Sequence, residues 1–169
     1  MNEELYRLYE EDQAERHVLD VSGSQAAWER LRERDAARRV QAQALLAAGM
    51  VPVAADYYHL AMLFQHGETR ADYERAHEYA LAVVERGQPH ARWLVAATHD
   101  RWLVTQGKPQ KYGTQFVMKE GRWQLYDLDP TTTDTERAAW GVPPVAETER
   151  MMNSDNGPPP ITGGADESP

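Results

Sequence analysis

The spacing of apolar side chains is the feature that most constrains this chain. From Glu3 to Thr105, leucine, alanine, valine and aromatic residues recur every three to four positions, which is the period of an α-helix with one buried face. Glycine or proline interrupts the pattern at intervals, and these residues end or begin helices. Ser24 is suited to cap the N-terminus of the second helix. The pattern predicts five helices, at about residues 3–19, 25–48, 53–65, 72–86 and 89–105.

The periodicity changes after Gly107. Two short runs of alternating character, 114–119 and 122–128, flank the dipeptide Glu120-Gly121, and this arrangement predicts a β-hairpin with a two-residue turn. A threonine-rich segment follows the hairpin and can cap a short helix. The expected fold class is mainly α: a helical bundle or short helix-pair array of about five helices, with a small C-terminal β-hairpin and a short final helix.

One helical domain is expected over residues 1–150, because a chain of this length can bury a single core of ordinary size. Residues 151–169 are rich in Gly, Pro, Ser and Asp, a composition that predicts a disordered tail. Breaks at Gly67 and Gly87, with small residues between them, give a loose likeness to tetratricopeptide and Sel1-like helix pairs. A compact helical bundle explains the same spacing.

The composition excludes several classes of function. A formal net charge of −9 argues against nucleic-acid binding, because affinity for phosphate backbones comes from clustered Lys and Arg. Without cysteine the chain has no disulfide, thiol nucleophile or thiolate metal site. Its first residues lack the regions of a signal peptide, and no apolar run is long enough to span a membrane. We therefore expect a cytoplasmic protein that binds neither nucleic acid nor membrane.

The stretch Lys108–Gln115 departs from the helical pattern, because it combines a proline, a glycine and several uncharged hydrogen-bonding side chains. Shortly before it, Asp100 places a carboxylate in an apolar helical stripe, where the charge must be paired or hydrogen-bonded. An ion pair with Arg38 or Arg39 is one explanation and a functional role is another, and the two are compatible. Arg101 offers a planar guanidinium suited to a carboxylate or phosphate.

The available side chains allow acid–base chemistry more readily than other mechanisms. His59 and His66 lie seven residues apart, whereas the two-histidine zinc signature on a helix needs a four-residue spacing with a glutamate between. We therefore expect no metal or other cofactor. The serines lie in predicted loops or in the tail, so no nucleophile–base triad can be assembled. Proton transfer by His66 with Asp100, assisted by Tyr112, is the chemistry that remains.

Four short motifs follow one another along the chain: Asp12-Gln13-x-x-Arg16, Gln65-His66, Asp100-Arg101 and Lys108-Pro109-Gln110-x-Tyr112-Gly113-Thr114-Gln115. In this order they resemble an uncharacterised bacterial domain-of-unknown-function family of small helical proteins, marked by a Gln-x-Tyr-Gly-Thr-Gln signature. The likeness covers residues 4 to 148 approximately. It implies that these polar positions belong together, and it names no activity. The continuation of the second motif into Gly67-Glu68 departs from the pattern expected there.

Two functions from different classes are compatible with these motifs. The first is a metal-independent acid–base enzyme of the hydrolase, lyase or isomerase type. It would act on a small polar or anionic substrate in a pocket between the helices and the 108–115 loop, with His66, Asp100 and Tyr112 as catalytic residues. The alternative is a non-catalytic helical-repeat module that binds a peptide or protein partner, in which the polar motif only holds the hairpin onto the helices. The expected substrate-binding residues are Asp12, Gln13, Arg16, Gln65, Arg101, Gln110, Gly113, Thr114 and Gln115.

Overall fold

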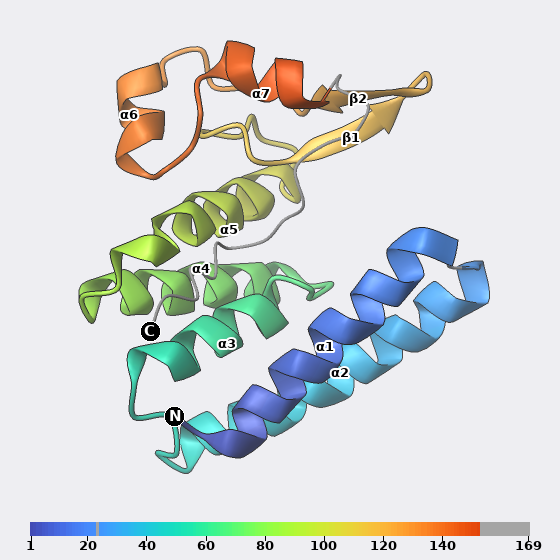
Figure 1. The fold of residues 1–169 in the computed structure, drawn as a ribbon, viewed down its shortest axis with the longest axis vertical. Coiled ribbons are helices and arrows are strands. Elements are labelled where there is room, and N and C mark those ends of the chain that lie inside the picture. The colour runs from blue at the N-terminus through green and yellow to red at the C-terminus, as the bar shows by residue number, and fades with distance from the viewer. Residues whose placement is uncertain (23, 153–169) are drawn as a thin grey trace. The chain divides into compact units, whose positions relative to one another are not determined.

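The computed structural model describes residues 1–22 and 24–152, with the side chains of residues 19–22 left out. Over these residues the chain is mainly helical, with seven α-helices, one 3₁₀ turn and a two-stranded antiparallel sheet (Figure 1). This confirms the fold class predicted from the apolar spacing. The predicted tail from residue 153 onward lies outside the described residues.

We expected one domain over residues 1–150. The contacts between residues divide the chain into two compact units, Met1–Gly87 and a second unit that begins at Gln88. The division falls at Gly87, a glycine with φ +82° that follows the fourth helix. Each unit has its own buried residues, and each is described by itself below.

The first unit consists of four helices. They are α1 (Glu3–Ser22), α2 (Gln25–Ala47), α3 (Ala54–Phe64) and α4 (Arg70–Glu85). The Ser24 side chain accepts a hydrogen bond from the Ala27 amide, which confirms the predicted N-cap of α2. Helix α3 packs against the other three, and five consecutive residues from Leu60 to Phe64 are buried. This short apolar helix is therefore the centre of the unit.

The turn before α4 explains why Gly67 follows the second motif. The Asp72 carboxylate accepts hydrogen bonds from the Glu68 and Thr69 amides and from the Thr69 hydroxyl, and the Thr69 hydroxyl accepts from the Asp72 amide. This is a capping box, which begins the helix two residues earlier than predicted. A Cβ atom at Gly67 would lie 2.2 Å from Asp72 Cβ. Only glycine fits there.

The second unit combines helices with the small sheet. It comprises the 3₁₀ turn η1 (Pro89–Ala91), α5 (Arg92–Val104), β1 (Phe116–Lys119), β2 (Arg122–Leu125), α6 (Asp134–Ala139) and α7 (Val145–Met152). The strands pair antiparallel with Phe116 opposite Leu125 and Met118 opposite Trp123. Glu120 and Gly121 both have positive φ, as a two-residue hairpin turn requires. The predicted hairpin is confirmed, with strands shorter than expected.

Helix α7 was not predicted, and it includes Met151 and Met152, the first two residues of the expected tail. The helix runs from Val145 through Met152, packs against β2 and buries Thr148 and Met152. It follows Pro143 and Pro144, which sequence analysis treats as helix terminators, and its two turns contain too few apolar residues to reveal a period. Contacts within the second unit determine this helix.

Leu60→Ala is expected to lower the free energy of unfolding by about 2–5 kcal/mol, because Leu60 is fully buried in α3 and its removal leaves a cavity. Val40→Ala, on exposed α2 surface, is the control and should change stability by no more than about 0.5 kcal/mol. Urea denaturation of both variants measures the difference. Equal effects would contradict the central place of α3.

Candidate functional site

The loop that follows α5 is organised around the carboxylate of Asp100. Asp100 is completely buried, and each of its oxygens accepts two hydrogen bonds. Oδ1 accepts from the amides of Lys111 and Tyr112, both at 2.8 Å. Oδ2 accepts from the Thr114 amide at 3.0 Å and the Thr114 hydroxyl at 2.9 Å. The carboxylate therefore replaces the backbone partners that this irregular segment lacks.

Gln110 forms a second set of bonds with the same loop. Its Oε1 accepts from the Gln115 amide at 2.9 Å, and its Nε2 donates to the carbonyl oxygens of Gln115 and Tyr126. Its backbone bonds to Asp127 and Asp129, in the segment after β2. Both ends of this buried amide are occupied, so Gln110 ties the loop to the hairpin.

Gly113 is required by packing within the chain. It has φ +79°, and a Cβ atom there would lie 2.5 Å from Nη1 of Arg137. The Arg137 side chain is 1% exposed, and its Nε and Nη2 donate to the Pro143 carbonyl. Burial lowers the pKa of Arg137, while the charges of Asp134 and Asp100 oppose that shift. The group that closely approaches the Gly113 backbone is therefore this guanidinium.

The remaining motif residues of the second unit also bond within it. Gln115 Nε2 donates to the Ala97 carbonyl at 3.2 Å, and Arg101 Nε donates to Gln115 Oε1 at 3.1 Å. Tyr112 packs with Ala96 and Val142, and burial raises its pKa. These contacts are those expected if the polar groups of the 108–115 motif stabilise the loop in which they lie.

In the first unit, the Asp12, Arg16 and His66 side chains form a compact charged cluster. His66 Nδ1 lies 2.9 Å from Asp12 Oδ2, and Arg16 Nε lies 2.8 Å from the same nitrogen. Asp12 is buried, while the His66 and Arg16 side chains are 13% and 22% exposed. Gln13 donates to Asp12 Oδ2 at 2.8 Å. The first two motifs named in the sequence therefore meet through α1 and the end of α3.

A neutral imidazole nitrogen can accept one hydrogen bond, and a protonated one can donate one. His66 Nδ1 has a partner for each state, since Arg16 Nε donates and the Asp12 carboxylate accepts. The geometry thus supports both the protonated and the unprotonated form of this nitrogen. Proton transfer at His66 would not leave a buried group without a partner.

Three charged residues that were not proposed as site residues complete this cluster. Arg16 Nη2 and Arg38 Nη1 both bond to Asp35, and Arg39 Nη1 donates to the His66 carbonyl at 3.1 Å. The sequence does contain a signal, because Asp35 interrupts the apolar stripe of α2. Arg38 and Arg39 bind carboxylates of their own unit, while the partners of Asp100 in its unit are loop amides and the Thr114 hydroxyl.

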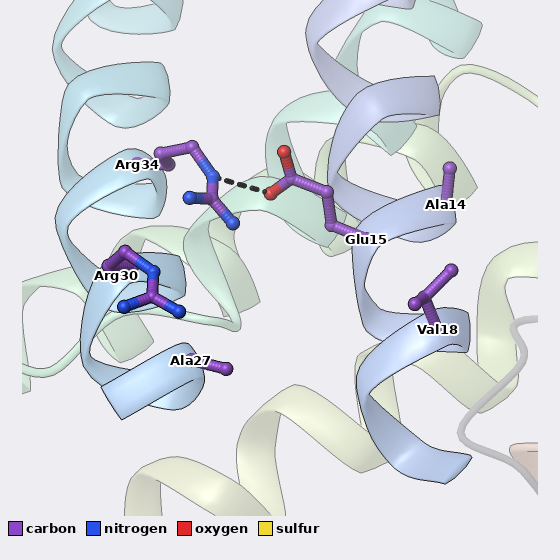
Figure 2. Close-up of a pocket in the computed structure, with 6 residues that line it drawn as sticks. All are labelled: Ala14, Glu15, Val18, Ala27, Arg30 and Arg34. Carbon is purple, nitrogen blue, oxygen red and sulfur yellow. Dashed lines mark hydrogen bonds and ion pairs between the residues drawn. The ribbon is translucent and has the colours of Figure 1, made fainter. Parts of the chain in front are cut away.

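The cluster continues along α1 and α2 to the surface. Glu15 accepts from Arg34 Nε at 2.9 Å and also pairs with Arg38 Nη2 at 2.9 Å. Figure 2 shows the Glu15–Arg34 link between the two helices, beside Ala14, Val18, Ala27 and Arg30. The two helices of this hairpin are therefore joined by ion pairs as well as by apolar contacts.

The carboxyl groups of Asp12 and Asp35 have opposite pKa shifts. Burial would raise the pKa of Asp12, but the hydrogen bond and charge of His66, together with Arg16, outweigh it and lower the pKa to about 2. Burial also raises the pKa of Asp35, and the nearby Asp12 charge adds to this effect against the opposing Arg16, giving about 6. The pair therefore holds one proton in mildly acidic solution.

The predicted site residues fall into two groups. Asp12, Gln13, Arg16 and His66 meet in the first unit, and Asp100, Arg101, Gln110, Tyr112, Gly113, Thr114 and Gln115 belong to the second. Gln65 is buried in the first unit and donates to the Met62 sulfur at 3.0 Å. The catalytic combination of His66 with Asp100 and Tyr112 includes residues of both units and stays a prediction. Among the described residues no group of three or more acidic, His or Cys side chains could hold a metal ion.

Comparison with known proteins found no family model, no curated protein and no solved structure that matches this chain. The resemblance to a bacterial family consequently rests on the four motifs alone. Over the described part of the chain, the helices are too short or too polar to cross a membrane.

Asp100→Asn is expected to destabilise the 110–115 loop by about 3 kcal/mol. The NH₂ group of asparagine would replace one carboxylate oxygen and would place an N–H donor against a loop N–H that now donates to that oxygen. Hydrogen exchange of the Lys111, Tyr112 and Thr114 amides should then accelerate by roughly 100-fold. Asp129→Asn is the control, because Asp129 accepts a hydrogen bond from the Thr131 amide at an exposed turn and does not contact the amides measured here. Unchanged protection would show that Asp100 does not hold the loop.

Asp35 is expected to make stability fall as pH rises. The pKa of Asp35 is about 6 in the folded chain and near 3.8 in the unfolded chain. Between pH 3.8 and pH 6 the folded state therefore binds more protons than the unfolded state. The free energy of unfolding should decrease by up to about 3 kcal/mol from pH 4 to pH 6.5. Asp35→Asn should remove this slope, whereas Glu33→Gln, on the exposed face of α2, should retain it. Urea denaturation across this range measures the slope, and equal slopes for the wild type and Asp35→Asn would contradict the assignment.

Proposed function

We propose that the protein is a metal-independent acid–base enzyme of the hydrolase, lyase or isomerase type, acting on a small polar or anionic substrate, with His66 as the group that transfers the proton. The observation that carries the proposal is the pair of partners at His66 Nδ1, the Asp12 carboxylate at 2.9 Å and Arg16 Nε at 2.8 Å. A general acid–base must change its protonation state in each cycle. This arrangement supports both states.

The neighbours of His66 have distinct roles in this proposal. Asp12 is ionised and stabilises the imidazolium that forms when His66 Nδ1 takes up a proton. Arg16 is held by both Asp12 and Asp35, and its partly exposed guanidinium provides a positive charge for an anionic substrate. Arg39 binds the His66 carbonyl and fixes the backbone at the end of α3. These contacts therefore hold the imidazole ring of His66 in a fixed position.

The motif residues of the second unit take supporting roles. Asp100 holds the 110–115 loop through four hydrogen bonds, so we assign it to positioning. The roles of Tyr112 as an assisting acid and of Arg101 as an anion-binding residue stay predictions from the sequence. Tyr112 belongs to the loop that Asp100 and Gln110 maintain, and Arg101 on α5 donates to Gln115 of that loop.

One observation favours the alternative of a non-catalytic helical module. Asp100, Gln110, Thr114 and Gln115 direct their hydrogen bonds to backbone groups or to one another, as they would if the motif served only to hold its loop. This argument concerns the second unit. The charged cluster of His66 is not explained by loop stabilisation, and for that reason we prefer the enzyme.

The proposal is tested with a panel of small carboxylates, phosphate esters, carboxylic esters and hydroxy acids. Thermal shift identifies ligands, because binding to the folded state raises the melting temperature, and NMR then follows their conversion. For a converted compound, His66→Gln should lower kcat by about 10²–10⁴-fold, the usual contribution of a general acid or base. Asp12→Asn should lower it as well, with a changed pH profile.

His77→Gln is the matched control, because His77 is also a half-buried histidine of the first unit and lies on α4. It should leave kcat within about twofold of the wild type. Turnover that survives His66→Gln, or that His77→Gln abolishes equally, would contradict the assignment of His66. A panel in which nothing is converted would favour the binding module.

A further inference from the structure

The carboxyl groups of Asp12 on α1 and Asp35 on α2 form a hydrogen bond with each other. Their side chains are buried, with 1% and 3% of their surface exposed. Two ionised carboxylates offer only acceptors, so a hydrogen bond between them requires a proton on one of the two groups. Burial and the nearby Asp12 charge raise the pKa of Asp35 to about 6, while the pKa of Asp12 is lowered to about 2. The protonated carboxyl group of Asp35 therefore donates to ionised Asp12 in mildly acidic solution.

Two arginines contact Asp35, and each of them also binds another carboxylate. Arg38 Nη1 lies 3.1 Å from Asp35 Oδ1, and Arg16 Nη2 bonds to Asp35 Oδ2. Arg16 also pairs with Asp12, and Arg38 also pairs with Glu15. Because each positive charge is shared between two carboxylates, the proton on Asp35 is not displaced. The charged groups farther out are Glu11 of α1, 4.0 Å from Arg38, Arg34 of α2, which pairs with Glu15, and Arg39 of α2, which pairs with Asp72 of α4.

His66 connects this buried pair to solvent. Its Nδ1 lies 3.2 Å from Asp12 Oδ1 and 2.9 Å from Asp12 Oδ2. Whichever Asp12 oxygen accepts the proton of Asp35 is therefore within hydrogen-bond distance of the imidazole. The His66 side chain is 13% exposed. Arg16 also contacts both aspartates, but a guanidinium does not release its protons. The proton of Asp35 is therefore exchanged with solvent by way of His66.

We propose that Asp35 stores a proton for His66 and delivers it to Nδ1 through the carboxylate of Asp12. The O–H bond of Asp35 breaks as the proton passes to an Asp12 oxygen. The proton on Asp12 then forms an N–H bond with the Nδ1 lone pair. Asp35 ends as a carboxylate, His66 as an imidazolium and Asp12 unchanged. Asp35 acts through Asp12 and is thus a positioning residue, and its part in turnover rests on the proposed function of His66.

The proton store is tested on the full chain without substrate, by ¹³C NMR of the Asp35 carboxyl resonance from about pH 4 to pH 8. His66→Gln should raise the midpoint of the Asp35 titration by about 0.5 pH unit or more, because the pair loses the cation that favours its ionised form. His77→Gln, which changes a half-buried histidine on α4, is the control. It should move the midpoint by less than about 0.1 unit. An Asp35 midpoint that His66→Gln leaves in place would overturn the proposal.

A second variant tests the route through Asp12. In an Asp12→Asn background, the shift of the Asp35 midpoint caused by His66→Gln should fall below about half its original size, because the connecting carboxylate is gone. An undiminished shift would overturn the transfer through Asp12. If Asp12→Asn does not fold, the comparison of His66→Gln with His77→Gln still decides whether Asp35 and His66 are linked.

Turnover is the last readout, for any compound that the panel shows to be converted. Asp35→Asn keeps a donor to Asp12 but has no proton to release, so kcat should fall about tenfold while KM stays within about twofold. An unchanged kcat would overturn the part of Asp35 in turnover. A panel without conversion contradicts only the enzyme, because the NMR measurement of the link between Asp35 and His66 uses no substrate.

Discussion

Burial of carboxylates is the constraint on which both units depend, because an ionised oxygen removed from water must be given other partners. The two units meet this requirement in different ways. Asp100 receives only uncharged donors, three amides and a hydroxyl, and orders an irregular loop in return. Asp12 and Asp35 instead receive charged or ionisable donors from Arg16, Arg38 and His66. Neutral donors make a fixed structure, whereas titratable donors make a cluster that responds to protons.

This difference guides the assignment of roles. A carboxylate saturated by backbone amides has little capacity to take part in proton transfer, and its loss should appear first as a loss of order in its loop. A histidine with one donor and one acceptor at the same nitrogen can change its state within a fixed surround. We therefore assign the proposed chemistry to His66, and we assign the motif of residues 108–115, apart from Tyr112, to holding its own loop.

Charge also limits the partners of the chain. Its net charge of −9 disfavours anionic ligands in general, so any anion that binds must find local compensation. Arg16 beside His66 is such a position, because two buried aspartates fix its guanidinium. This local positive charge suits the small anionic substrate that we propose.

The sequence by itself determined the helical class, the hairpin at Glu120-Gly121, the cap at Ser24 and the threonine-capped short helix after the hairpin, because periodicity, turn chemistry and capping are local properties. It also selected the polar motif residues. It did not reveal α7, whose two turns after two prolines depend on packing against β2. Only the tertiary structure decided which charges meet: His66 reaches Asp12 across 54 positions, and Arg16 reaches Asp35 across 19. Such pairings depend on how α1, α2 and α3 pack, because the chain contains many arginines that could pair with a buried carboxylate.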